Sequence, residues 1–295
     1  VVFMEKLTLF LMTRKGLSVL RALLPEYRDL ITAVVTSRDT SILDDCYDEI
    51  VALCDETGIQ CYNRSDYSTV ESGYALAISW RWLIPASSMR LIVVHDSLLP
   101  KYRGFNPLVT ALINGDSEIG ATALWAAEEY DRGDIIRQES RAISYPIRIT
   151  DAIEVMSDIY VCLVLEIAAI LIDGGTLGST AQDESAASYS LWRDDDDYCI
   201  DWSLPSDRLK RQIDAQGYPY LGSSALIDGK RVRIISAECV EDVRIANRSS
   251  GKVIFVVKGR PVVVCGQGLL KVLEVVCDET NESALPLPRY RTRFK

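Results

Sequence analysis

The chain has 295 residues, of which 48% are hydrophobic and 25% charged, and such a composition is typical of one large or two medium globular domains. Its formal net charge of −10 argues against wholesale nucleic-acid binding as its task. The charge is uneven, because residues 201–295 contain 16 basic and 11 acidic residues and so carry a net charge of +5. This difference is compatible with a domain boundary near residue 200, or with two solvated surfaces that simply differ.

The cysteines and the single histidine restrict the chemistry further. None of the eight cysteines forms a CxxC pair, so we expect no metal site. Scattered thiols are typical of a reduced, cytoplasmic protein. The longest apolar run, residues 159–172, is interrupted by Glu166 and is too short for a bilayer, so we expect no membrane segment. Residues 1–10 have no cleavage pattern and lead into a first strand instead of forming a signal peptide.

The first 80 residues alternate short apolar runs with amphipathic segments. Four of these runs are predicted strands: residues 7–13, 31–36, 59–62 and 74–79. Helical patterns over 17–24 and 41–57 lie between them, which predicts right-handed βαβ units and a mostly parallel sheet. The turn TRKG at 13–16 could offer two cations and a helix N-terminus to an anion. It is neither a GxGxxG nor a Walker loop, which favours a plain strand-to-helix turn.

The fourth strand ends in an unusual loop, WRWLIP at 80–85. Ligands bind beyond the carboxyl ends of the strands in such sheets, so Trp80 and Trp82 could form a floor for a flat ligand. The alternative is that both indoles simply pack beneath the loop.

The middle of the chain continues the α/β pattern. The predicted elements are a strand at 91–94, a helix at 105–113, a strand at 120–126, an acidic turn at 128–134 and a long helix at 151–172. Thr150 is a suitable N-cap for that helix, and Gly174 and Gly175 end it.

From residue 176 the pattern changes. Residues 176–187 have the composition of a linker, and we therefore expect one domain over 1–187 and a second over 188–295. The second begins with a helix near 207–215. Short strands follow, with hairpin turns at Asp228-Gly229 and Lys258-Gly259, which predicts a small antiparallel β-barrel or open sheet.

The only histidine, His95, follows the strand at 91–94. A lone histidine is ordinarily satisfied in the core, but this one has the polar neighbours Asp96 and Ser97. Asp131 lies near the end of another strand, so its carboxylate could face the imidazole. Such a pair can transfer protons, because the carboxylate stabilises the imidazolium and fixes the tautomer.

Three segments resemble one family. HDSLLPKYRG at 95–104, GATAL at 120–124 and YDRGDII at 130–136 are similar to motifs of the 10-formyltetrahydrofolate-dependent formyltransferases. SYSLWRDDDDYCIDW at 188–202 resembles the segment that leads into the C-terminal domain of these enzymes. The resemblance implies a mostly parallel, Rossmann-like α/β catalytic domain, followed by a small antiparallel β-barrel-like domain. It also implies N10-formyltetrahydrofolate as the cofactor and a primary amine as the acceptor.

The resemblance also implies roles for individual residues. His95 would assist proton transfer and stabilise the tetrahedral intermediate, while Asp131 would orient His95 or accept the amine proton. The folate would contact two walls of the cleft, formed by Trp80, Arg81, Trp82, Leu83, Ser97, Leu98, Glu128, Tyr130 and Asp131. The acceptor would contact the loop after His95, with Lys101, Tyr102, Gly104 and Asn106 as candidates.

One position departs from the family pattern. The family asparagine two residues before the histidine is Val93 here. That asparagine would donate a hydrogen bond to the formyl oxygen, and the loss of one such donor costs about 2.7–4 kcal/mol. Three interpretations remain open: a backbone N–H or Asn106 replaces the donor, the enzyme is slow, or the protein is a formyl-folate hydrolase or a folate-binding protein.

The acceptor is inferred by comparison within the family. Members that act on initiator methionyl-tRNA carry a basic insertion after the second strand, whereas the segment here is acidic, which argues against tRNA as a partner. Members that act on glycinamide ribonucleotide usually end near the first domain. HDSLLPKYRGFNPL is most similar to the sugar N-formyltransferase branch, which implies an amino sugar, often nucleotide-linked, for surface glycans. Methionyl-tRNA formyltransferase is the alternative, and a homodimer is compatible with the second domain.

Overall fold

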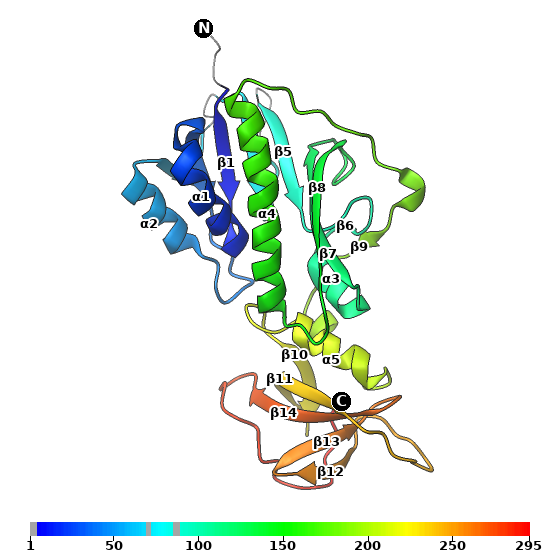
Figure 1. Ribbon diagram of the computed structural model, residues 1–295. Coiled ribbons are helices and arrows are strands. Elements are labelled where there is room, and N and C mark those ends of the chain that lie inside the picture. Colours follow the sequence, from blue (N-terminus) through cyan, green and yellow to red (C-terminus); the bar gives the residue numbers. More distant parts are fainter. Residues whose placement is uncertain (1–4, 69–71, 85–88) are drawn as a thin grey trace. The chain divides into compact units, whose positions relative to one another are not determined.

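The computed structural model describes residues 5–68, 72–84 and 89–295 (Figure 1). Residues 1–4, in the segment discussed above as a first strand or a signal peptide, and Pro85 of the tryptophan loop lie outside the described residues. The chain divides into two compact units. The first comprises residues 1–108, 117–143 and 151–191, and the second comprises residues 109–116, 144–150 and 192–295.

The first unit is built on a seven-stranded sheet with the order β3-β2-β1-β4-β5-β7-β8. The strands are β1 (Leu7–Leu11), β2 (Ile31–Thr36), β3 (Gln60–Asn63), β4 (Tyr74–Ile78), β5 (Arg90–His95), β7 (Glu118–Trp125) and β8 (Ile135–Ala142). The first five strands in that order pair in parallel, and β5, β7 and β8 pair antiparallel. The predicted mostly parallel α/β sheet is therefore confirmed.

The central strands β1 and β4 are buried along their whole length. Strands that are covered on both faces have continuous apolar sequences, and LTLFL and YALAI are such sequences. The helices of this unit are α1 (Thr13–Tyr27), α2 (Tyr47–Thr57) and α4 (Ile149–Ile172). Figure 1 shows α4 running along the sheet near β1 and β5, and the Tyr160 hydroxyl oxygen on α4 lies 3.0 Å from the Val94 carbonyl oxygen of β5.

Several predicted helix boundaries were wrong. The TRKG segment is the first turn of α1 and does not precede it. Helix α2 begins at Tyr47 and not at residue 41, because Asp39, Asp44 and Asp45 accept hydrogen bonds from backbone N–H groups of 41–47 and hold that segment as a loop. Thr150 lies inside α4, which begins at Ile149, so it is not the N-cap.

Helix α4 is the one helix in the described part of the chain whose length and apolar composition would suffice to cross a membrane, with a mean hydropathy of 2.3 over its best window. Half of that window is buried inside the protein. Helices of this kind also form the cores of globular units, so the observation is weak support for a membrane span.

The segment expected to be a linker is instead bound to the first unit. Thr180 exchanges two backbone hydrogen bonds with Ile135, and β9 (Tyr189–Ser190) pairs in parallel with β6 (Arg103–Gly104). We call residues 180–190 the strap. A composition rich in Ser, Ala and Gly suggested a free linker, but backbone groups supply these contacts and composition does not reveal them.

The second unit contains helix α5 (Ser206–Ala215) and a five-stranded antiparallel sheet with the order β10-β11-β14-β13-β12. Its strands are β10 (Ser223–Ile227), β11 (Lys230–Val240), β12 (Val253–Val257), β13 (Arg260–Val264) and β14 (Leu269–Cys277). Both predicted hairpin turns are confirmed, because Asp228, Gly229, Lys258 and Gly259 all have positive φ, as two-residue turns of this kind require. Most of α3 (Pro107–Asn114) also belongs to this unit, and its Ile113 carbonyl accepts a hydrogen bond from Arg211.

Candidate active site

His95 and Asp131 lie together at the strand ends of the first unit. His95 is the last residue of β5 and is 8% exposed. Its Nδ1 lies 3.4 Å from Oδ1 of Asp131, and its Nε2 lies 2.9 Å from the carbonyl oxygen of Tyr102. The expectation that the carboxylate faces the imidazole is confirmed. Since both ring nitrogens face oxygen acceptors, the site can hold an imidazolium that donates from both nitrogens.

The backbone also fixes the Asp131 carboxylate. Asp131 has a φ of 56°, and its Oδ2 accepts a hydrogen bond of 2.8 Å from the Gly104 N–H. Gly104 itself has a φ of 103°, and a Cβ at this position would lie 2.5 Å from the Ser190 carbonyl oxygen. The RG motif therefore needs glycine because no side chain fits between the strap and the N–H that holds Asp131.

Thr122 of β7 forms two hydrogen bonds with the SLLP loop, residues 97–100. Thr122 donates to the Ser97 carbonyl (2.6 Å) and accepts from the Leu99 N–H (3.0 Å). Ser97 is buried, and its hydroxyl donates to the Lys101 carbonyl (2.6 Å). Leu98 covers Gly120, where a Cβ would lie 2.6 Å from Leu98 Cδ2. These contacts join the loop to the GATAL segment of β7.

A buried polar group next to His95 was missed at the level of sequence. Lys15 forms an ion pair with Asp96, and the Tyr160 hydroxyl donates to the other oxygen of that carboxylate (2.5 Å). Burial alone would raise the pKa of Asp96, but the charge and hydrogen bond of Lys15, with Tyr160 and His95, hold it below its usual range. Lys15 therefore turns inward and neutralises this carboxylate, and the signal available in the sequence was the acidic residue directly after His95.

The tryptophan loop packs tightly in its described part. The Trp80 ring contacts Phe10 and Trp82 edge to face, with centroid distances of 5.2 and 5.3 Å, and the Arg64 guanidinium lies 4.3 Å from the Trp82 ring. Arg81 forms an ion pair of 2.6 Å with Asp39, and Leu83 is 95% exposed. The buried Nε1 of Trp80 has no hydrogen-bond partner among the described residues. The loop thus combines packed indoles with an indole donor that is not used within this part of the chain.

The other predicted site residues lie on the two loops that meet at Asp131. Glu128 and Tyr130 are exposed in the turn after β7, and the Tyr130 ring contacts Phe105 edge to face at 6.2 Å. On the loop after β5, the Lys101 ammonium lies over the Tyr102 ring at 4.6 Å. Tyr102 and Asn106 both have left-handed backbones, with φ values of 59° and 49°. Gly104 connects the two loops through its N–H.

Val93, which stands where the family has asparagine, lies in β5 between Ala77 of β4 and Leu124 of β7. Its side chain packs against a buried apolar cluster that includes Phe10 and Val35. The strand position two residues before His95 is therefore apolar, and any donor to a formyl oxygen has to come from another residue.

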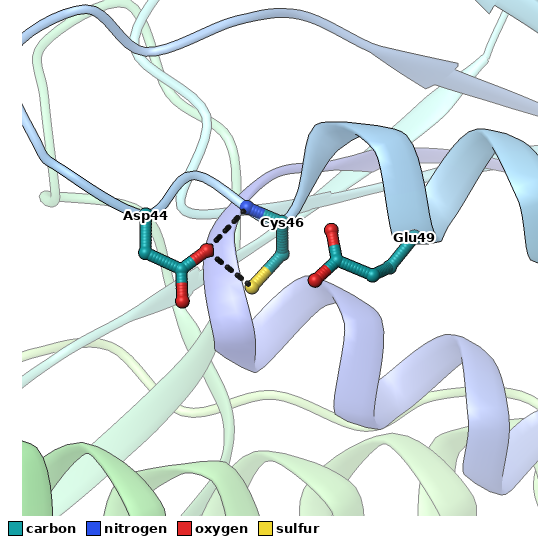
Figure 2. A group of neighbouring side chains, drawn as sticks. All are labelled: Asp44, Cys46 and Glu49. Carbon is teal, nitrogen blue, oxygen red and sulfur yellow. Dashed lines mark hydrogen bonds between the residues drawn. The ribbon is translucent and has the colours of Figure 1, made fainter.

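A group with metal-ligand side chains lies at the start of α2, away from the expected patterns. Figure 2 shows Asp44, Cys46 and Glu49, whose ligand atoms lie within 4.8 Å of one another. The Cys46 thiol donates to the Asp44 carboxylate (3.7 Å), and Asp44 and Glu49 are exposed. Metal-site spacings of the CxxC or histidine type do not reveal this group.

Cys46 is expected to be unreactive. Burial, followed by the charges of Asp44 and Glu49, raises the pKa of Cys46 to about 12, so almost none of it is thiolate near neutral pH. Iodoacetamide at pH 8 should therefore alkylate Cys46 on the order of 100-fold more slowly than the exposed Cys199, as followed by peptide mass spectrometry. Equal rates at the two thiols would contradict this environment for Cys46.

A mostly parallel sheet with an imidazole–carboxylate pair at its strand ends, followed by an antiparallel unit, is the arrangement expected of a formyltransferase. Residues 65–157 match the family model described as Formyl transferase, and residues 193–284 match the model described as Formyl transferase, C-terminal domain. The chain belongs to the formyl transferase family.

Its relatives by sequence and by fold carry different names. A methionyl-tRNA formyltransferase of Syntrophomonas wolfei is 32% identical over 224 residues, which are 74% of this chain and 70% of the relative. For the corresponding protein of Ralstonia nicotianae, at 33% identity, the match spans 56% of the relative.

Two solved structures share the fold at low identity. One is an N-formyltransferase from Helicobacter canadensis in complex with folinic acid and dTDP-3-aminofucose. Its TM-score is 0.70 at 16% identity, and the match covers 91% of this chain and 99% of that chain. A sugar 3N-formyl transferase solved in the presence of dTDP and 5-N-formyl-THF has a TM-score of 0.69 at 15% identity, with coverages of 97% and 99%.

Proposed function

We propose that this protein transfers a formyl group from N10-formyltetrahydrofolate to the primary amine of an amino sugar, with a nucleotide-linked sugar as the acceptor class. The observation that carries the transfer chemistry is the His95–Asp131 pair, with 3.4 Å between Nδ1 and Oδ1, in which the Gly104 N–H from the loop after His95 holds the Asp131 carboxylate. This pair lies within the part of the chain that matches the family model.

The residues of the pair have complementary tasks. An amine attacks only as the neutral base, and it must lose a proton as the amide forms. Asp131 is suited to receive that proton or to stabilise the charged imidazole, because its second oxygen is already fixed by Gly104. The Tyr102 carbonyl holds His95 from its other side, so the ring cannot rotate away from the carboxylate without losing a hydrogen bond.

The described residues also fit a folate. When bound, the cofactor supplies the activated formyl group, and the protein must offer donors and flat apolar surface to its ring system. The tryptophan loop offers both, with the Nε1 of Trp80, which has no partner among the described residues, the indole of Trp82 and the exposed Leu83. Asn106 and the backbone N–H groups of its loop are the candidates for the donor that Val93 lacks.

The preference for a sugar acceptor over tRNA depends on charge. The connection between β2 and α2, residues 37–46, carries Asp39, Asp44 and Asp45, and its Arg38 forms ion pairs with Asp45 and Asp48. Binding of tRNA needs free cations that displace counterions from phosphates, and this connection offers carboxylates instead. The two fold neighbours, one a sugar 3N-formyl transferase and the other in complex with dTDP-3-aminofucose, add support of a weaker kind.

Methionyl-tRNA formyltransferase is the second candidate, because the sequence relatives carry that name. A formyl-folate hydrolase is the third, because Val93 removes the family donor. The assay that separates them incubates the protein with N10-formyltetrahydrofolate and one acceptor at a time: a dTDP-linked amino sugar, methionyl-tRNA, or none. Tetrahydrofolate release that requires the sugar supports the proposal, and release only with tRNA or without any acceptor contradicts it.

A further inference from the structure

The strap carries a side chain that touches both the Asp131 segment and a buried arginine. The Gln182 amide nitrogen donates to the Asp131 carbonyl (2.7 Å) and to the Gly133 carbonyl (2.8 Å). Its amide oxygen accepts two hydrogen bonds from Arg103, at 3.1 Å from Nε and 2.7 Å from a terminal nitrogen. Both N–H groups of the amide therefore donate to the turn that contains Asp131.

We propose that Gln182 is a positioning residue for formyl transfer, which holds the left-handed turn at Asp131 and thereby aims its carboxylate at His95. The expected loss of rate rests on the proposed function. The placement of the Asp131 carboxylate against His95 by Gln182 does not depend on it.

Backbone conformation supports the proposal. A non-glycine residue with a φ of 56° adopts a disfavoured conformation, which persists only where the surroundings determine it. Gln182 binds the carbonyl groups of Asp131 and Gly133, and Gly104 binds the Asp131 side chain. The residue is thus held at its backbone and at its carboxylate by two different segments.

Arg103 in turn fixes Gln182. Arg103 is 1% exposed, and its terminal nitrogens donate to both oxygens of Glu184 at 2.8 and 2.7 Å. Its backbone pairs with the strap as well, since the Arg103 N–H donates to the Ser188 carbonyl (2.8 Å). The strap therefore has one rigid connection to the loop that follows His95 and one, through Gln182, to the turn that contains Asp131.

The test compares three variants that separate these contacts. In Gln182→Glu the carboxylate keeps its pairing with Arg103, whereas the oxygen in place of the amide nitrogen repels the two carbonyl groups, so the hold on the Asp131 turn is lost. Gln182→Met is the neutral counterpart, which keeps the fold measurable if the charged variant does not fold. Asp183→Asn is the matched control, because Asp183 is the next strap residue and, among the described residues, its carboxylate accepts hydrogen bonds from Ser185.

Displacement of a catalytic group by about 1 Å can cost on the order of 100-fold in rate, so Gln182→Glu should lower kcat about 10- to 100-fold with KM for the folate changed less than about threefold. Asp183→Asn should leave both unchanged. In an Asp131→Asn background, Gln182→Glu should cost less than about twofold more, because its effect passes through Asp131. An equal loss of kcat in both backgrounds would overturn the proposal.

A second readout does not need catalysis. His95 is the only histidine of the chain, so 15N-histidine labelling gives one set of ring signals. Gln182→Glu and Gln182→Met should shift the Nδ1 signal, Asp183→Asn should not, and neither Gln182 variant should shift it further in the Asp131→Asn background. If the wild-type protein transfers no formyl group to any acceptor but this pattern appears, the proposed function fails and the positioning role stands. Unchanged His95 signals in both Gln182 variants would refute the role.

Discussion

Replacement of His95 by asparagine should lower kcat/KM for formyl transfer by about 10²–10⁴-fold, because asparagine can fill the site but cannot exchange a proton near neutral pH. The amide can still donate toward the Tyr102 carbonyl, so the loop after β5 should keep its conformation. Tetrahydrofolate release under saturating acceptor measures the rate, and fluorescence titration measures folate affinity, which should change less than about threefold.

Combination with Asp131→Asn tests whether the two residues act as one unit. Residues that share one catalytic task lose it together, so the double variant should be about as slow as His95→Asn alone. Full activity in His95→Asn would refute the site. Multiplied losses in the double variant would show that Asp131 acts independently of the imidazole.

Replacement of Asp96 by asparagine should destabilise the folded state by about 3–5 kcal/mol, because it leaves the Lys15 ammonium largely buried without its counter-charge. The Lys15 and Asp96 side chains are only 11% and 19% exposed. Urea unfolding followed by tryptophan fluorescence measures the change. Glu154→Gln is the matched control: it removes an ion pair to the neighbouring Arg14 whose side chains are 48% and 59% exposed, and should change stability by less than about 0.5 kcal/mol.

The stability that the Lys15–Asp96 ion pair gives the folded state should depend on pH. The pKa of Asp96 is lowered in the folded protein. The stabilisation of the folded state by the ionised Asp96 is therefore fully present above its unfolded-state pKa of about 3.9, and it is lost as the pH falls through the folded-state pKa. The stability difference between the wild type and Asp96→Asn should therefore be constant at neutral pH and narrow below about pH 4.

A Lys15→Met, Asp96→Leu double variant should regain much of the stability, since an apolar pair of similar size needs no counter-charge. A double variant less stable than Asp96→Asn would contradict this account.

Much of the fold could be predicted because it depends on local signals. The apolar run at 7–13 predicted strand β1, and Asp228-Gly229 and Lys258-Gly259 predicted hairpin turns that only residues tolerant of positive φ can form. Helix starts were predicted less well. At α2 the side chains of Asp39, Asp44 and Asp45 compete for backbone N–H groups, and that competition depends on how the loop folds back.

By itself the sequence determined the α/β order of elements, the two hairpin turns and the pairing of a single histidine with Asp131, 36 positions later. The order of the elements and the turns depend on periodicity and on residue type. The pairing was predicted from the residue types of a proton-transfer pair and from the family motifs, because Asp131 follows β7, which runs antiparallel to β5. Only the tertiary structure decided that Lys15 turns inward to Asp96 and that the strap, by composition a linker, carries Gln182 to the backbone of Asp131. The physical reason is that these contacts join residues 51 to 81 positions apart through buried charges and backbone carbonyl groups, which leave no periodic trace in a sequence.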